Sequence, residues 1–426
     1  LIDGNNSMML VRLQGIESFE GGVGTKHFRL TADIDAAATS SWNSGAGFDP
    51  IPKVFTGSLD GDNFTISDLY IDASADSAVE KAGLFSEIEN FDISHLTLSN
   101  ISVENTPTNS DAGSIAGEAG AQSTTILDVH VTGSITSGGS SGGLIGRDDS
   151  FATTIQQSSF EGNVSARNAA GGLIGTAVPA DHAITISDTY AILTTLSVSL
   201  SDGTAHPFVD SEEFSLSGAG GPTGNISNSY AVASSVSGSP RTTGYSELTT
   251  SNVYIQDGGQ NFAGLTPLPQ ANMTGIAAVE NMTFSSWSDT WVVTDSYPEL
   301  LAHSDGTEPA VILFDGSATV SPAAPDAGDT VTVTVPLQNL GGTSGQETLT
   351  LVYDGQTVDS NPVNLVRGSS NTALQWDSAP TDGGNQTLTV TTSSQSQDVS
   401  VTLAQVNSPP TVTNRSVSVT AGQTVD

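Results

Sequence analysis

The chain has 426 residues, of which 46 are Asp or Glu and only 10 are Lys or Arg, so its formal charge is −36. We expect no nucleic acid partner, because binding to phosphates needs the opposite charge. Direct membrane insertion is not expected either, since no apolar run approaches the ~18 residues of a membrane span. The absence of cysteine excludes disulfides and thiolate metal sites.

The acidic excess predicts a protein adapted to high salt. Like charges at this density repel one another, and the screening length falls to about 3 Å in molar salt. The composition resembles that of haloarchaeal surface proteins, and an acidic secreted adhesin from a marine bacterium is the alternative. In both cases we expect an extracellular protein at the cell surface, with no signal peptide in this sequence.

The first part of the chain is expected to begin an elongated fold. Residues 1–26 are interpreted as an N-terminal cap, because residues 8–11 are apolar and the open end of such a fold needs a cover. Residues 27–72 supply the first strands, with Asp60-Gly61-Asp62 as a turn between two of them.

A glycine-rich motif then returns at a nearly constant spacing. One copy is Ser141-Gly142-Gly143-Leu144-Ile145-Gly146 and the next is Ala170-Gly171-Gly172-Leu173-Ile174-Gly175. Weaker copies stand at 82–86, 112–117 and 206–210. Spacings of 30, 30 and 29 residues separate Gly83, Gly113, Gly143 and Gly172. A second motif alternates with the first, starting at residues 93, 126, 155, 186 and 226.

Two motifs that alternate at a fixed period predict one structural unit stacked on itself. The runs are short and β-branched, are interrupted by Gly, Asn, Asp and Ser, and lack helical periodicity. A coil of about 30 residues made of such strands is one turn of a right-handed parallel β-helix, and each coil adds ~4.8 Å. We expect Leu144 and Ile145 in the interior, with Leu173 and Ile174 as their neighbours in the next coil.

These motifs resemble the GLUG repeat of bacterial and archaeal surface proteins, over roughly residues 1–303. Residues 27–71 are similar to the segment that precedes such repeats, and residues 273–301 are similar to the segment that ends them. The resemblance implies a β-helix over 27–303. We expect residues 256–303, with the bulky Trp287 and Trp291, to cover the final coil. Polar loops around 176–184 and 200–223 are expected to project from one flank and to carry binding.

The repeat period breaks at residues 304–308, and a different pattern follows over 309–404. Its strict alternation, as in Val331-Thr332-Val333-Thr334-Val335, and its frequent turns predict a seven-stranded immunoglobulin-like sandwich. Residues 320–355 are similar to the cell-adhesion-related CARDB domain. Residues 405–426 are interpreted as a linker and one strand, which belongs to a further immunoglobulin-like domain or is donated to a neighbouring copy.

Three acidic groups are the candidates for catalysis, because some β-helices are polysaccharide enzymes and hydrolysis needs two carboxyls about 5–10 Å apart. They are Asp148 with Asp149, Glu212 with Glu213, and Asp181 beside His182. Such pairs arise by chance among 46 acidic residues, and neighbours in a strand point to opposite faces. No His-Glu-x-x-His motif occurs, and no Gly-x-Ser-x-Gly elbow stands at a strand–helix junction. We therefore expect no catalytic residues and no enzyme.

No cofactor is expected, with calcium as the one alternative. Asp33-Ile34-Asp35 and Asp60-Gly61-Asp62 bring oxygens together, yet neither continues into a full calcium loop, and structural turns explain both. Asn-x-Ser/Thr sequons are the candidate N-glycosylation sites. They are Asn5, Asn63, Asn100, Asn163, Asn225, Asn272, Asn281, Asn385 and Asn414.

These features favour a structural or adhesive function, in which a rigid β-helix on immunoglobulin-like spacers displays its faces and loops. The expected partner is a cell-surface glycan or protein, and self-association through residues 405–426 would build filaments. One alternative is a β-helix polysaccharide lyase or hydrolase, which would show a groove of aromatic residues and carboxylates. The other is a viral tail or spike fibre that binds the host surface.

Overall fold

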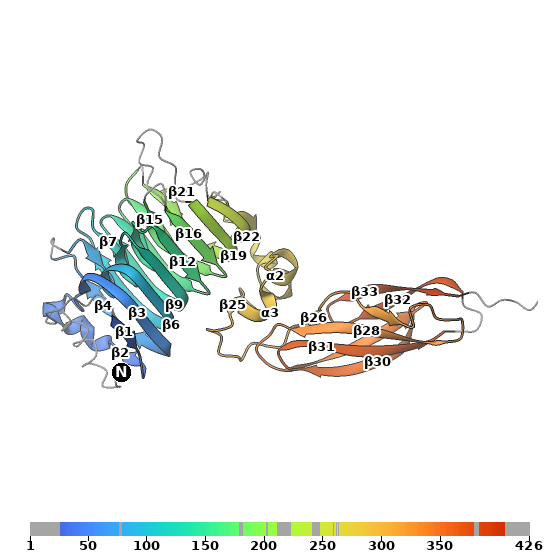
Figure 1. The fold of residues 1–426 in the computed structure, drawn as a ribbon. Helices are drawn as coiled ribbons and strands as arrows, with labels where there is room; N and C mark the ends of the chain where they lie inside the picture. Colours follow the sequence, from blue (N-terminus) through green and yellow to red (C-terminus); the bar gives the residue numbers. More distant parts are fainter. Residues whose placement is uncertain are drawn as a thin grey trace, which may run out of the picture. The chain divides into compact units, whose positions relative to one another are not determined.

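The structure is a computed structural model that describes residues 26–75, 79–178, 182–201, 203–210, 223–240, 248–258, 260, 262, 264–378 and 383–404. The chain forms two units, Leu1–Glu308 and Pro309–Asp426 (Figure 1). Several expectations fall outside the described residues. They concern the cap at 1–25, Asp181, Glu212, Glu213, Asn5, Asn414, and the segment 405–426.

The first unit is a parallel β-helix, as the repeats predicted. One continuous sheet contains β1 (Lys26–Arg29), β2 (Ile34–Asp35), β3 (Ile51–Ser67), β4 (Tyr70–Asp72), β6 (Phe85–Asn105), β8 (Ala116–Ala119), β9 (Ser123–Ser137), β11 (Ile145–Asp148), β12 (Ala152–Gln156), β13 (Ser159–Ala166), β15 (Ile174–Ala177), β16 (Ala183–Ser187), β17 (Tyr190–Val198), β19 (Thr223–Ala233), β20 (Val236–Ser237), β22 (Leu248–Gln256) and β23 (Thr266–Leu268). A second sheet contains β5 (Lys81–Ala82), β7 (Asp111–Gly113), β10 (Ser140–Gly142), β14 (Ala169–Gly171), β18 (Thr204–His206) and β21 (Ser239–Pro240). The short 3-10 helices η2 (Ala37–Ser41) and η3 (Asn43–Gly45) lie between β2 and β3.

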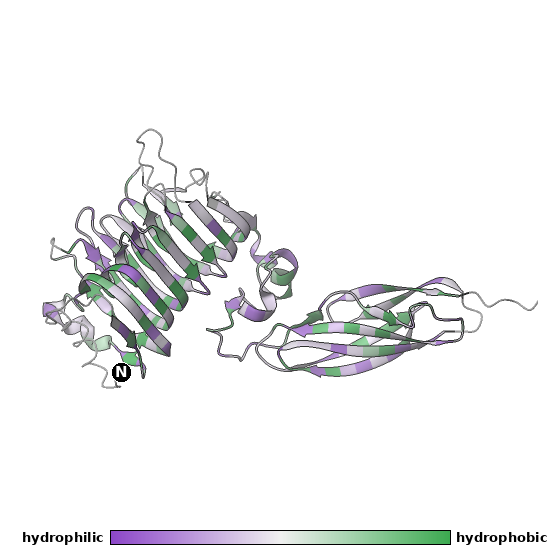
Figure 2. Ribbon diagram, in the orientation of Figure 1, coloured by the Kyte–Doolittle hydropathy of each residue, from purple (hydrophilic) through white to green (hydrophobic). Residues whose placement is uncertain are grey.

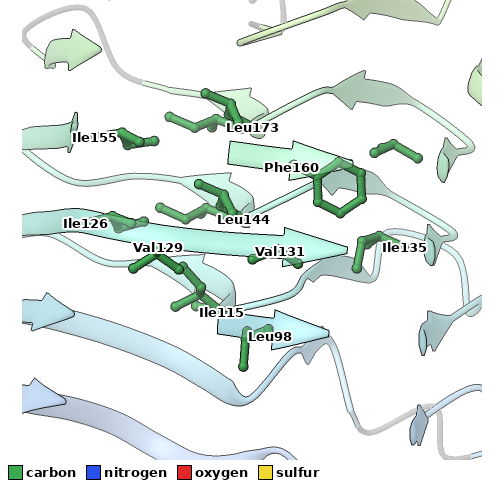
Figure 3. Close-up of a cluster of buried hydrophobic side chains, with 14 of the residues drawn as sticks. Leu98, Ile115, Ile126, Val129, Val131, Ile135, Leu144, Ile155, Phe160 and Leu173 are labelled. Atoms are coloured by element: carbon green, nitrogen blue, oxygen red, sulfur yellow. The ribbon is translucent and has the colours of Figure 1, made fainter. Parts of the chain in front are cut away.

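Identical positions of successive coils stack in the interior, which explains why the second motif begins with isoleucine. One column of paired, buried residues runs through six coils, namely Leu59, Ile93, Ile126, Ile155, Ile186 and Ile226. Figure 3 shows Ile126 and Ile155 of this column among other buried aliphatic side chains. The column ends at Thr250, which pairs with Ile226 and is exposed. A polar residue at this end avoids leaving an apolar side chain in water.

The predicted register of the glycine-rich motif is confirmed. Ile145 pairs with Ile174, and the amide of Leu144 donates a hydrogen bond of 2.9 Å to the carbonyl of Leu173. These four side chains are 0% exposed. The weak copy at 206–210 follows the same register, because the amide of Leu173 donates a hydrogen bond of 2.8 Å to the carbonyl of Phe208.

The counted spacing of the glycines was wrong by one position. Gly113 pairs with Gly142 rather than with Gly143, because this coil has 29 residues from Ala112 to its partner Ser141. Gly142 is required by a close approach, since a Cβ there would lie 1.9 Å from the carbonyl oxygen of Ile145. The strands of the second sheet therefore lie flat against the strands that follow them, and only glycine leaves room for this contact.

A corner column of polar residues marks one bend in six successive coils. Its members have φ between 45° and 57° and occupy equivalent positions after the isoleucine strand: His95, Asp128, Gln157, Asp188, Asn228 and Asn252. This left-handed conformation is tolerated best by Asn, Asp and glycine among common residues. The Asn- and Asp-rich breaks in the sequence are therefore these bends.

The segment after the coils contacts β22 of the last coil, at Asn252, Tyr254 and Gln256, and extends from there along the side of the β-helix. Parallel pairing stops at β23, and residues 273–304, here called the closing segment, run along the side of the β-helix. Its elements are α2 (Gly275–Asn281), α3 (Trp287–Thr290), β24 (Trp291–Val292) and β25 (Glu299–Leu300), preceded by η4 (Gln270–Asn272). The bulky aromatic residues of the closing segment pack against the side face of the β-helix.

The second unit is an immunoglobulin-like sandwich with eight strands in its described residues, one more than the seven expected. One sheet contains β26 (Ile312–Phe314), β27 (Thr319–Ser321), β28 (Thr330–Asn339) and β31 (Gly368–Asp377). The other contains β29 (Gly345–Tyr353), β30 (Gln356–Leu365), β32 (Gly384–Thr391) and β33 (Ser396–Leu403). β27 was missed because three residues before Pro322 give almost no alternating signal. The alternation along the other strands is visible in Figure 2, and it buries one face of each.

Candidate functional site

The side face of the β-helix carries a column of aromatic residues. Tyr190 pairs with Tyr230, and Tyr230 pairs with Tyr254, so their rings stand on adjacent coils. The Tyr190 and Tyr230 rings are stacked at 5.3 Å. His130 holds the equivalent position two coils before Tyr190, with Ser159 between them. The motif copies ISDTYA and ISNSYA contain this tyrosine in the same place, so the column has a periodic signal in the sequence.

The closing segment covers this aromatic column with its own aromatic residues. Trp291 is 0% exposed and lies 5.8 Å from the ring of Tyr230 and 4.9 Å from that of Phe284. The Tyr230 hydroxyl donates a hydrogen bond of 2.6 Å to the carbonyl of Pro298. Aromatic pairs at such distances add to the free energy of burial. The side face is therefore a second, aromatic core.

Polar contacts fasten the closing segment to the corner column, coil by coil. Thr283 Oγ1 donates to Asn252 Oδ1 over 2.9 Å, and Asn228 Nδ2 donates to Ser285 Oγ over 2.9 Å. Ser286 Oγ donates to Asp188 Oδ1. At the far end, His303 Nε2 lies 3.0 Å from Asp128 Oδ1. The segment thus runs back along the β-helix from the last regular coil towards the middle.

Two carboxylates lie at the edge of the aromatic column. The Tyr190 hydroxyl donates to Glu161 Oε1 over 2.9 Å. Burial raises the pKa of Glu299, and the negative charges of Glu308, Glu161 and Asp305 raise it further. Sequence reasoning missed this acidic pair, because Glu161 and Glu299 belong to segments far apart in the chain.

His130 is held neutral by its position under the closing segment. Its ring lies 5.1 Å from that of His303, and burial, followed by the charge of His303, lowers the pKa of His130 from 6.5 to about 4. The unfolded chain therefore binds one more proton than the folded chain between these two pH values.

We expect the contribution of His130 to the free energy of unfolding to fall by about 3 kcal/mol as the pH is lowered from 6.5 to 4, because each unit of pKa difference is worth about 1.4 kcal/mol. Urea unfolding of the full chain at constant salt measures this slope. In His130→Gln, which has no titrating ring, the slope should be smaller by the same amount. An equal slope in both proteins would contradict the role of His130.

The structure brings together two candidate residues that were not expected to meet, Asp148 and His182, which was expected beside Asp181. His182 Nε2 lies 3.3 Å from Asp148 Oδ2 and 3.3 Å from Ser150 Oγ. A catalytic triad needs the carboxylate and the hydroxyl on different ring nitrogens, so this arrangement is not one. All three side chains are 0% exposed and cannot meet a polymer.

The other half of the Asp148–Asp149 pair has different partners, because it lies just after the end of β11. Asp149 accepts hydrogen bonds of 3.1 and 3.2 Å from Arg147 Nε, while Asp148 accepts one of 3.1 Å from the amide of Ser150. The pair does not converge on one site.

The two calcium candidates are structural turns. Asp60 and Asp62 both contact Arg29, with 3.5 Å from Asp60 Oδ2 to Arg29 Nε. Asp35 Oδ1 accepts from the amide of Ala37 over 2.9 Å. In the described part of the chain, no group of three or more His, Asp or Glu side chains could hold a metal ion. Among those same residues, no helix has the length and apolar character needed to cross a membrane.

The described sequons differ in accessibility. Asn63, Asn100 and Asn385 are exposed, and a second group is partly buried: Asn163, Asn225, Asn272 and Asn281. The amide of Asn100 donates to Asp68 over 2.6 Å. Thr402 Oγ1 likewise donates to Asn385 Oδ1 over 2.8 Å, and glycosylation of all three exposed sequons stays a prediction.

Comparison with known proteins identifies the family of the second unit's sandwich. Residues 310–400 match the family CARDB, so the sandwich of the second unit is a CARDB domain that follows a parallel β-helix. Over 118 residues the chain is 45% identical to Halomucin of Haloquadratum walsbyi (strain DSM 16790 / HBSQ001). The matched region covers 26% of this chain and 1% of Halomucin. The chain therefore spans only a small part of this relative.

Two solved structures share partial likeness with the chain. IgA1 Protease is 21% identical, with a TM-score of 0.41 over 60% of this chain and 20% of that protein. A β-glucosidase from Erythrobacter marinus is 18% identical, with a TM-score of 0.19 over 27% of this chain and 18% of that protein. Neither likeness is close enough to bear on function.

Proposed function

We propose that the protein is a non-catalytic structural or adhesive protein at the cell surface of a halophile. In this proposal the GLUG-type β-helix is a rigid rod that displays its faces and loops, and the CARDB domain is a spacer. The observation that carries it is the similarity to Halomucin, found in a chain that also contains a CARDB domain. The charge of −36 fits the same setting.

The environment of the catalytic candidates supports a non-enzymatic role. Asp148 and His182 are buried inside the coils, and Asp149 is engaged by Arg147. The partner that we propose is a cell-surface glycan or protein, which the solenoid would meet through its exposed side chains and loops. N-glycans at Asn63 and Asn385 would be compatible with such a surface.

Surface location can be tested with the full-length protein in a haloarchaeal host. Intact cells are treated with protease in high salt, and an antibody against the CARDB domain follows the chain. We expect the signal to disappear from intact cells while a cytoplasmic marker survives. A chain that is cut only after lysis would overturn the proposal.

Self-association through residues 405–426 is part of the same proposal. A chain ending at Gln405 is compared with the full chain by electron microscopy and light scattering in molar salt. Assemblies should form only with the full chain, because a strand donated head to tail builds an open filament. Equal assembly of the truncated chain would show that another surface is responsible.

A dependence on salt follows from the charge. We expect the melting temperature to rise steadily from about 0.1 M to about 2 M NaCl, because the screening length shrinks from about 10 Å to a few ångströms. Differential scanning fluorimetry measures the shift. Sulfate is not a suitable salt here, since it strengthens apolar burial whatever the charge. A melting temperature that is independent of NaCl would favour an ordinary acidic adhesin.

The second candidate function is a carbohydrate-active enzyme, favoured by the carboxyls Glu161 and Glu299 beside the aromatic column. A raised pKa at Glu299 is what a general acid needs. Incubation of the chain with neutral and acidic polysaccharides, followed by reducing-sugar analysis, tests it. Activity in the native chain that is lost in Glu299→Gln would replace the non-catalytic proposal.

A further inference from the structure

The contacts between the closing segment and the corner column have one gap. Asn252, Asn228, Asp188 and Asp128 each meet a side chain of the closing segment. Gln157 stands between Asp128 and Asp188 in the same column. Within the described residues, its side-chain amide has no hydrogen-bond partner.

A cavity opens at this gap. Its volume is about 170 Å³, and it is lined by Gln157, Asp289, Thr290, Leu300, Leu301 and Ala302. A single water needs only ~10–15 Å³ of such volume, so the cavity admits a ligand of several non-hydrogen atoms. The walls come from α3 and β25 on one side and from the corner column on the other.

The lining combines a few polar groups with an apolar wall. The Gln157 amide can donate and accept, and the exposed carboxylate of Asp289 accepts from hydroxyls. Leu300, Leu301 and Ala302 supply the apolar wall, against which the C–H face of a pyranose can lie. One carboxylate cannot supply the six to eight oxygens that calcium takes. The charge of −36 disfavours an acidic sugar.

We propose that this cavity binds one neutral hexose residue of a glycan. The proposal rests on the adhesive function proposed above and names the ligand class of one site on the side face. Binding to a single residue is weak, and repeated copies on a surface would raise the avidity without any new contact. The closing segment then has two roles: it covers the aromatic column and forms one wall of the site.

Saturation-transfer difference NMR with the full chain in molar NaCl tests the site. The probes are the methyl glycosides of glucose, galactose, mannose and N-acetylglucosamine. We expect saturation to reach at least one of them. In Gln157→Leu the affinity should fall about tenfold, because one buried hydrogen-bonding group is worth about 1.4 kcal/mol. In Ala302→Trp, which fills the cavity from its exposed rim, transfer should be lost.

Gln122→Leu is the matched control, because Gln122 is exposed on the same β-helix and does not line the cavity. Circular dichroism confirms that each variant is folded. The proposal would be overturned if no saturation reached any of the four glycosides. It would also be overturned if Gln157→Leu and Ala302→Trp each showed the same transfer as the native chain. Protease access on intact cells tests surface location independently of glycoside binding. If the chain is accessible on the surface but binds no glycoside, the hexose site alone is refuted.

Discussion

Leu173→Asp is expected to destabilise the β-helix by about 5 kcal/mol or more. The substitution removes a fully buried aliphatic side chain, which alone costs about 2–5 kcal/mol, and adds an unpaired charge that costs several more. Leu173 lies between Leu144 and Phe208 of the adjacent coils, so both neighbours lose their contact. The loss approaches the whole stability of a typical domain.

Hydrogen exchange shows which coils of the β-helix lose stability in Leu173→Asp. Because each coil contacts mainly its neighbours, exchange should rise first in the coils around residues 140–210 and less in the CARDB domain. Leu173→Met is the control, since a swap that conserves volume costs less than about 1.5 kcal/mol. Leu173→Asn has nearly the shape of Leu173→Asp but no charge, so the difference in stability between these two variants is the cost of the buried charge. Protection equal to that of the native chain in Leu173→Asp would contradict the interior register.

Trp291→Ala is expected to release the closing segment from the side face at a cost of about 3–5 kcal/mol, the usual range for a buried Trp. Trp291 is 0% exposed and contacts both Tyr190 and Tyr230. Removal of its ring would leave Tyr190 without its aromatic contact to the closing segment and Tyr230 with that of Tyr297 alone. The hydrogen bond between Thr283 and Asn252 is exposed and contributes too little to compensate for that loss.

Limited proteolysis in high salt measures the release. Cleavage within residues 273–304 should become much faster than in the native chain, while cleavage of the CARDB domain stays unchanged. Trp291→Phe keeps most of the apolar contact and should stay close to the native rate. If Trp291→Ala resisted cleavage as well as the native chain, the closing segment would be held by its polar contacts instead.

The local repeats carried enough information to predict the β-helix. Equal side chains at Ile126, Ile155 and Ile186 recur at the spacing of one coil, and the stacking of like on like is a local consequence of that period. The alternation of Val331, Val333 and Val335 likewise predicted a strand with one buried face. Errors arose where the signal was short, at the three residues of β27 and at the offset of Gly113.

The candidate site could not be predicted in the same way. The closing segment has no repeat of its own, and its partners lie far away in the chain, as Ser286 and Asp188 do at 98 positions. The sequence showed that its aromatic residues must be buried, but not against which face. Neither the cavity at Gln157 nor the pair Glu161 and Glu299 corresponds to a repeating pattern in the sequence.

The sequence by itself determined the class of fold, the stacking of the coils and the acidic, cysteine-free character of the surface. Period and alternation are properties of neighbouring residues, and strand geometry converts them directly into buried faces. Only the tertiary structure decided that the closing segment lies along the side of the β-helix and fastens to the corner column. That choice depends on shape complementarity between distant segments, such as Trp291 against Tyr190 and Tyr230, which no local pattern encodes.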